Sequence, residues 1–305
     1  MTPATLLKSP LDSSLLSLDD AQLAFFREQT GIYDVEKLKQ HICDIQQKAY
    51  QHFPYPCIRR LQIARLPSYE HVLWIGKTFE RPIFLDVGCC FGHDLRALVA
   101  SGYPHEWVLG VDLKRDLWEL GTELFRAAEK ERPISFIEGD IFDDDFLDPS
   151  PKVQNIPKLF DVLPLKNLKS LTMLRGQASA IHTSMLFHLF PESDQLRMAK
   201  KLATLLSPVP GSIIFGNHIG LEESGIHTRN ASGIRMFCHS PQTWCEMWDG
   251  DVFPKGVVEV EAKLVSAGEA QPSQSLKENT NGFYGNDSDD RWKNIMWLVW
   301  SVKRI

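Results

Sequence analysis

The chain has 305 residues, of which 43% are hydrophobic and 24% are charged. These values exclude wholesale disorder and allow about two domains or one enlarged α/β domain. The balance of 33 basic and 39 acidic residues argues against a nucleic-acid-binding protein. No apolar run has the length of a membrane span, and the scattered cysteines predict neither a zinc site nor a disulfide framework. We therefore expect a cytoplasmic protein with no bound metal.

Helical patterns fill the first 80 residues. Start and stop signals bracket helices over 18–29 and 35–50, and a shorter helix is expected over 68–77. Pro54 and Pro56 end the second helix, because proline disfavours helical backbone in the residue before it. Residues 1–16 carry no sustained pattern. We expect residues 1–80 to form a tail and a helical cap that closes over the site and excludes water.

Residues 81–305 show strands that alternate with helices, so they predict one α/β domain with a parallel sheet. The expected strands are 82–86, 107–111, 134–138, 178–182 and 211–215, and the helices between them are 94–101, 116–130 and 192–206. Two further apolar strands, 257–265 and 295–302, flank a polar stretch at 271–290. They predict an antiparallel hairpin with a long loop.

A glycine turn follows the first predicted strand of this domain. Asp86 ends that strand, and Gly88 and Gly92 lie in the turn before the next helix. In open α/β sheets, ligands bind beyond the carboxyl ends of the strands, which places this turn in a site. A dinucleotide-binding turn would have glycine where this chain has Cys90 and His93. The turn therefore favours a nucleoside ligand without a pyrophosphate, and a structural turn with no ligand is the alternative.

Acidic residues also end the second and third strands. Asp112 lies twenty residues after Gly92, where a carboxylate binds ribose hydroxyls; a helix N-cap is the alternative interpretation. Asp140 is followed by Ile141 and Phe142, a pattern that suits the amine and ring faces of an adenine. An acidic surface loop is the alternative there, because residues 143–145 are all aspartate. Three acids at three successive strand ends indicate one shared ligand.

These positions resemble the class I S-adenosylmethionine-dependent methyltransferases. The strings FPYPCIRR (53–60), FLDVGCCFG (84–92), GDIFD (139–143) and SAIHTSMLFHLF (179–190) are similar to the fungal methyltransferases of meroterpenoid pathways, which esterify a carboxylate on a farnesylated aromatic polyketide. The resemblance implies a Rossmann-like, seven-stranded, mostly parallel sheet with a reversed last strand. It implies S-adenosylmethionine as cofactor, with Cys90 in place of the usual middle glycine. The cofactor-binding residues would be Asp86, Gly88, Cys90, Gly92, Asp112, Leu113, Asp140, Ile141 and Phe142.

The candidate catalytic and acceptor residues lie further along the chain. His182 and Ser184 follow the fourth strand, and His188 is expected on the same helical face as Ser184; a core position is an equal alternative for His188. The candidate acceptor-binding residues are Phe53, Tyr55, Arg59, Asn217, His218, Arg235 and Trp244, although the aromatic ones equally suit a core. Four arginines could hold a carboxylate, and the sequence does not choose among Arg59, Arg60, Arg229 and Arg235.

The function expected from the resemblance is transfer of a methyl group to a carboxylate of a hydrophobic polyketide–terpenoid, a small-molecule partner. Phenol or enol O-methylation is one alternative, and a non-catalytic methyltransferase-like binding protein is another. A nicotinamide oxidoreductase is disfavoured by Cys90 and His93. Whether the chain forms a homodimer stays open.

Overall fold

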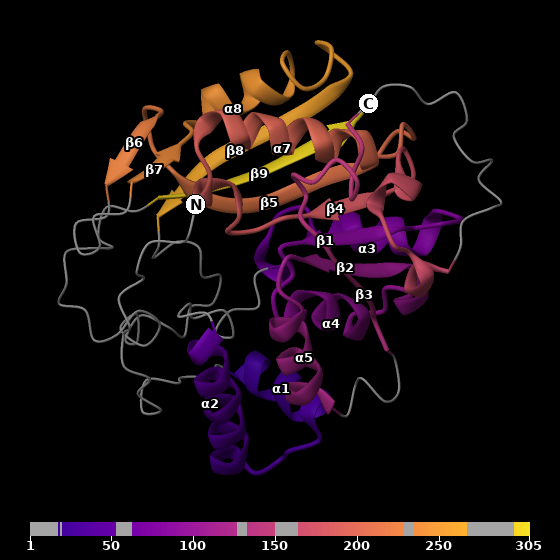
Figure 1. The fold of residues 1–305 in the computed structure, drawn as a ribbon, viewed down its shortest axis with the longest axis vertical. Coiled ribbons are helices and arrows are strands. Elements are labelled where there is room, and N and C mark those ends of the chain that lie inside the picture. Colours follow the sequence, from indigo (N-terminus) through magenta and orange to yellow (C-terminus); the bar gives the residue numbers. More distant parts are fainter. Residues whose placement is uncertain are drawn as a thin grey trace.

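A seven-stranded sheet forms the centre of the molecule in a computed structural model (Figure 1). The structure describes residues 18, 20–52, 63–126, 133–149, 164–228, 235–266 and 296–305. The sheet has the order β3-β2-β1-β4-β5-β9-β8. Its strands are β1 (Phe84–Val87), β2 (Val108–Asp112), β3 (Ser135–Glu138), β4 (Ala180–His182), β5 (Ile213–Gly220), β8 (Val258–Ser266) and β9 (Met296–Arg304). The last strand, β9, runs antiparallel to both of its neighbours, and the pairs from β3 to β5 are parallel, so the predicted topology is confirmed.

Helices lie on both faces of this sheet and at one end of the molecule. They are α1 (Asp20–Thr30), α2 (Val35–His52), α3 (Tyr69–Thr78), α4 (His93–Ala100), α5 (Arg115–Leu124), α7 (Glu192–Leu205) and α8 (Pro241–Trp248). Short 3-10 turns lie at Ile63–Arg65, His105–Trp107, Leu165–Asn167, Leu171–Leu174 and Phe187–Leu189. A separate two-stranded sheet pairs β6 (Gly225–Thr228) with β7 (Arg235–Cys238). Within the described ranges, no helix combines the length and apolarity that a membrane crossing requires.

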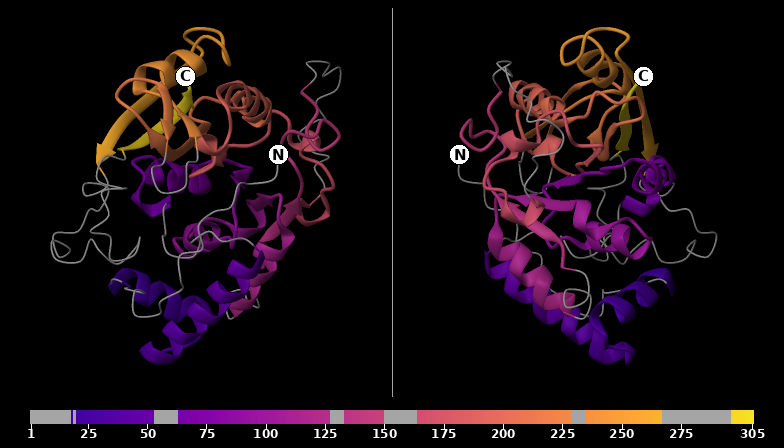
Figure 2. Two further views of the ribbon diagram at one scale, coloured as in Figure 1. Left: turned by 60° about the vertical axis from the view of Figure 1, so that its left-hand side comes forward. Right: turned by 90° about the vertical axis from the view of Figure 1, so that its right-hand side faces the viewer.

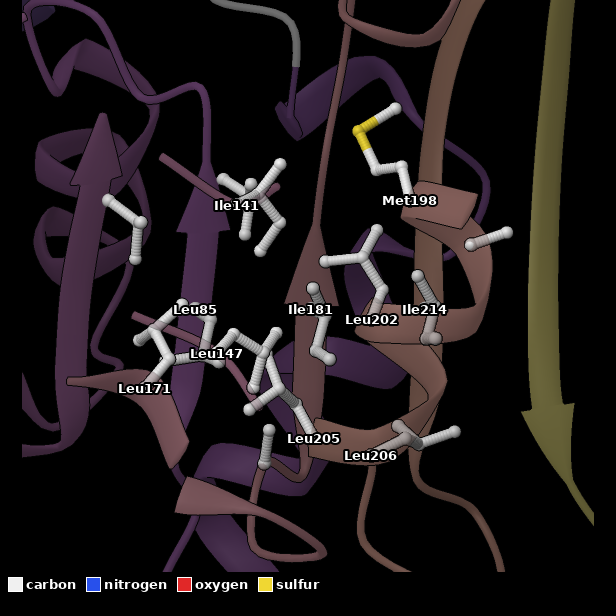
Figure 3. Packing of buried hydrophobic residues seen from close by; sticks show 14 of the residues in the cluster. Leu85, Ile141, Leu147, Leu171, Ile181, Met198, Leu202, Leu205, Leu206 and Ile214 are labelled. Carbon is white, nitrogen blue, oxygen red and sulfur yellow. The ribbon is translucent and has the colours of Figure 1, made fainter. Parts of the chain in front are cut away.

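The two faces of the sheet bury different apolar clusters. Leu85, Ile181 and Ile214 belong to one buried cluster that also contains Leu147 and, from α7, Met198 and Leu202 (Figure 3). Their strand neighbours on the opposite face pack against α3 and α4. Strands buried on both faces read as continuous apolar runs, which is why the parallel part of the sheet was recognisable from sequence.

The helices α1 and α2 pack against α5 at one end of the molecule, and Figures 1 and 2 show this contact from three directions. Phe26 of α1 stacks on Phe125, just past the end of α5, with 5.7 Å between ring centroids. Phe91, in the glycine turn, belongs to the same buried cluster. The cap helices therefore contact the turn through α5 and Phe91. A domain boundary near residue 80 and closure of the cap over the site stay predictions.

Several predicted elements differ in extent. The strand expected to end at Phe215 continues to Gly220, and the helix expected over 116–130 ends at Leu124, with 127–132 outside the described residues. Ser184 and His188 do not share a helix, because His188 lies in a separate 3-10 turn. The β6–β7 pair and α8 were not predicted, and the loop 271–290 lies outside the described residues.

Candidate functional site

The glycine turn links β1 to α4 through three residues with left-handed backbone. Gly88, Cys90 and Gly92 have φ angles of 82°, 51° and 64°. The Gly88 N–H donates to the carbonyl of Val111 (2.8 Å), which holds the turn against the end of β2. Left-handed backbone costs residues other than glycine about 1–2 kcal/mol, so Cys90 adopts a conformation that would favour glycine. The turn thus keeps a glycine-type path although its middle residue is a cysteine.

Asp112, at the end of β2, is bound to this turn. One carboxylate oxygen accepts from the Cys90 N–H (2.8 Å), and the other accepts from the Lys114 N–H (2.9 Å). Burial raises the pKa of Asp112, while the hydrogen bonds from the backbone act in the opposite direction. Asp112 is not the N-cap of α5, because that position is Lys114, which has no side-chain cap hydrogen bond; the bond from the Lys114 N–H instead closes the turn before the helix. A carboxylate has about four acceptor positions, so Asp112 can still accept hydroxyl donors from a ligand.

The loop after β3 lies next to the Asp112 loop, because the Gly139 N–H donates to the Asp112 carbonyl (3.1 Å). Asp140 is exposed, and its carboxylate accepts from the Phe142 N–H (2.8 Å). Ile141 is buried beside it. On the neighbouring loop, Leu113 is 55% exposed, which is unusual for a large apolar side chain at the carboxyl edge of a buried sheet. Carboxylates and apolar side chains thus meet along one edge.

Two cations on α7, neither of them predicted from the sequence, hold the loop after β3. Lys201 is 1% exposed, and its amino group donates to two loop carbonyls (2.7 and 3.2 Å) and to Asp144 (2.8 Å). Arg197 donates to the Phe142 carbonyl (2.7 Å). These contacts fix the loop that carries Asp140. No local signal identifies them, because a lysine on an amphipathic helix is ordinarily expected on the solvated face.

A hydrogen-bonded chain of three side chains joins β1 to the end of β4. His182 Nδ1 lies 2.8 Å from Asp86 Oδ1, and His182 Nε2 lies 2.7 Å from Ser184 Oγ. Asp86 and His182 are buried, at 4% and 2% exposure, whereas Ser184 is half-buried. The Asn217 N–H donates to Ser184 Oγ (3.3 Å). Asp86 therefore positions His182 directly, and His182 positions Ser184.

Burial lowers the pKa of His182, but the charge of Asp86 and its hydrogen bond outweigh that effect, so the pKa is raised overall. The segment after Ser184 lies close to the glycine turn, because the Leu186 side chain is 3.4 Å from the position that a Cβ on Gly88 would take. A Cβ on Gly216 would lie 1.9 Å from the Thr183 carbonyl oxygen. Only glycine at 216 permits this approach of β5 to the end of β4.

The other candidate acceptor residues near β5 are buried among aromatic rings. His218 is 1% exposed, accepts from the Trp300 indole N–H through Nδ1 (3.0 Å), and lies 4.5 Å from Trp244 between ring centroids. Burial, together with His188 and His239, lowers the pKa of His218 well below its ordinary value. His188 and Trp244 are 4% and 0% exposed. Each takes the core position that was the alternative from sequence, and a contact with the acceptor stays a prediction.

The remaining candidates lie away from this cluster or outside the described residues. Arg235 is exposed at the start of β7, where it pairs with Thr228 of β6. The others, Phe53, Tyr55, Arg59, Arg60 and Arg229, fall in ranges that the structure does not describe. Cys89 is buried, and burial, Asp112 and Asp86 all raise the pKa of its thiol well above its ordinary value, which agrees with a packing role.

Comparison with known proteins gives consistent similarities. A family described as the meroterpenoid methyltransferase N-terminal domain matches residues 11–63. Methyltransferase adrK of Penicillium roqueforti is 29% identical over 227 residues, covering 73% of each chain. Asnovolin E/Chermesin D methyltransferase nvfJ of Aspergillus novofumigatus is 30% identical over 217 residues, covering 70% of this chain and 69% of the relative. O-methyltransferase phiE of a fungal species is 28% identical over 252 residues, covering 81% of this chain and 75% of the relative.

Proposed function

This chain belongs to the family of fungal meroterpenoid methyltransferases, and on that premise we propose that it transfers a methyl group from S-adenosylmethionine to a carboxylate oxygen of a hydrophobic polyketide–terpenoid intermediate. The relative phiE is named an O-methyltransferase, and nvfJ is named for two methyl acceptors, asnovolin E and chermesin D. The observation that carries the proposal is the Asp112 carboxylate, which binds the glycine turn and retains acceptor positions at the carboxyl edge.

The residues at this edge fit S-adenosylmethionine. Asp112 would accept from the ribose hydroxyls, and the exposed Leu113 would cover one face of the adenine. Asp140 would accept from the adenine amine, because its loop is held beside the Asp112 loop. The turn from Gly88 to Gly92 would face the rest of the ligand. The bound cofactor supplies a methyl group already activated by its sulfonium.

The protein then has to orient the acceptor and exclude water rather than generate a nucleophile. A carboxylic acid has an ordinary pKa near 4 and is already ionised at neutral pH, whereas a phenol, near 10, would need a base. Asp86 raises the pKa of His182, so a larger fraction of its imidazole is already protonated at neutral pH and cannot accept a proton from the acceptor. His218 has one nitrogen occupied by Trp300 and is buried. These environments support an acceptor that needs no deprotonation.

The test uses two matched probes, a farnesylated benzoic acid and the farnesylated phenol in which hydroxyl replaces carboxyl. Purified enzyme is incubated with S-adenosylmethionine and each probe, and the products are analysed by mass spectrometry before and after mild alkali. We expect a methyl ester from the acid, cleaved by alkali back to the acid. An alkali-stable ether from the phenol alone would establish phenol methylation instead. Retained cofactor with no product from a panel of acids and phenols would favour a binding protein.

A further inference from the structure

We propose that Ser184 donates the hydrogen bond that binds the acceptor's carboxylate, and that the proton on His182 determines whether Ser184 is a donor. This inference rests on the proposed function, because it names how that site recognises a carboxylate. It follows from counting donors and acceptors along the chain of Asp86, His182 and Ser184.

The protonated state of His182 leaves Ser184 only one role. With both ring nitrogens protonated, Nδ1–H donates to Asp86 (2.8 Å) and Nε2–H donates to Ser184 Oγ (2.7 Å). The Asn217 N–H also donates to Ser184 Oγ (3.3 Å). A hydroxyl has two lone pairs and one proton, so both lone pairs are occupied and the O–H must bond to a third group. A ligand that binds there has to be an acceptor, and a carboxylate is the strongest such acceptor.

The neutral state reverses this preference. Asp86 keeps the single proton on Nδ1, because a carboxylate can only accept there. Nε2 then accepts from the Ser184 O–H, and Asn217 still donates to one lone pair. The lone pair that remains on Ser184 would repel a carboxylate and favour a donor. One proton on His182 thus changes Ser184 from a carboxylate donor to an acceptor.

The surroundings of His182 favour the protonated state. Asp86 on β1 carries the nearest charge, and Asp94 on α4 adds a second negative charge that also raises the pKa of His182. Asp94 itself lies 3.5 Å from His93 on the same helix. The side facing β5 is uncharged, because the Phe215 ring lies there with 5.2 Å between centroids.

The position of Ser184 suits an acceptor group. Its side chain is half-buried, unlike those of Asp86 and His182, so a ligand can reach the hydroxyl. The segment that follows it contacts the glycine turn, since Leu186 lies 3.4 Å from the Cβ position of Gly88. A carboxylate bound to Ser184 through one oxygen would therefore lie near the end of β1, with its second oxygen still unbound.

The first experiment tests whether the Ser184 hydroxyl contributes to ligand binding independently of any effect on the fold. Binding of farnesylated benzoate is measured by calorimetry in the presence of S-adenosylhomocysteine for the wild type, Ser184→Ala and Ser184→Thr. Ser193→Ala, an exposed serine on α7, is the matched control. We expect Ser184→Ala to raise the dissociation constant about 10- to 100-fold, because a hydrogen bond to a charged group is lost. Threonine should retain most of the affinity, and S-adenosylhomocysteine should bind all four proteins equally.

The second experiment tests the role of the His182 proton by measuring how the affinity for benzoate depends on pH. Benzoate stays ionised throughout the neutral and alkaline range, whereas His182 loses its proton as the pH rises through its raised pKa, so wild-type affinity should fall with rising pH. Ser184→Ala should show a flat profile, which a purely structural role for Ser184 would not produce. Ester formation by Ser184→Ala with wild-type KM and pH profile would overturn the inference and leave the proposed function standing. Ser184-dependent binding of the acid without any ester would support the inference and refute the proposed function.

Discussion

Replacing Asp112 by alanine tests the cofactor site most directly. The carboxylate has two roles, since it accepts backbone N–H groups from Cys90 and Lys114 and is expected to accept the ribose hydroxyls. The variant removes both roles. It should lower the stability of the fold by less than it lowers the affinity for the cofactor.

The stability loss should be small. Each hydrogen bond to a carboxylate contributes about 1.5–3 kcal/mol, but the Lys114 N–H is exposed and regains a bond to water. Burial raises the pKa of Asp112, which means that its charged form is disfavoured in the folded protein and that alanine removes this cost. The net loss therefore comes mainly from the Cys90 N–H, at about 1–2 kcal/mol.

The affinity loss should be larger. Loss of the ribose contact, at about 1.5–3 kcal/mol, raises the dissociation constant of S-adenosylhomocysteine about 10- to 150-fold. Calorimetric titration measures this change, and thermal denaturation in parallel measures stability. Asp251→Ala, at an exposed acid near the start of the segment leading to β8, is the control and should change neither. Unchanged affinity in a folded Asp112→Ala protein would refute the ribose assignment and leave only the hydrogen bonds of Asp112 to the two turns.

Single substitutions test the roles of Lys201, Gly121 and His239. Lys201→Met should release the loop that carries Asp140 and weaken S-adenosylhomocysteine binding by roughly 1 kcal/mol, about fivefold. Lys200→Met, on the exposed face, should not weaken it, and equal affinities of the two variants would contradict the anchoring role. Gly121→Ala places a Cβ 2.1 Å from a backbone carbonyl of the glycine turn, so the free energy of unfolding, measured with denaturant, should fall by about 1–3 kcal/mol. Gly225→Ala, whose Cβ would meet open space, is the control and should change the free energy of unfolding very little. Burial lowers the pKa of His239 to about 4, so the folded state resists its protonation. The free energy of unfolding should therefore fall by about 3 kcal/mol between roughly pH 6.5 and pH 4. His239→Gln should flatten that part of the stability profile, and an unchanged slope in the variant would contradict the role of His239.

The sequence determined the order along the chain of the seven strands of the main sheet and which residues lie at their carboxyl ends. Alternation of apolar strands with helices requires parallel pairing, and the carboxyl ends of parallel strands meet at one edge. Asp86, Asp112 and Asp140 could therefore be placed together without coordinates. The antiparallel pair β8 and β9 was equally visible, because two apolar strands flank one polar stretch.

The tertiary structure determined which side chains contact one another and which are buried. Asp86 pairs with His182 because β1 lies beside β4, ninety-six residues away, and no local pattern encodes that neighbour. Lys201 is buried because the carbonyls of a distant loop surround its amino group. His218 and Trp244 are core residues because α8, which carries Trp244, packs its ring against His218 of β5 and Trp300 of β9. Local spacing determines backbone periodicity, whereas hydrogen-bond partners and burial depend on contacts between segments far apart in the chain, which only the packed fold establishes.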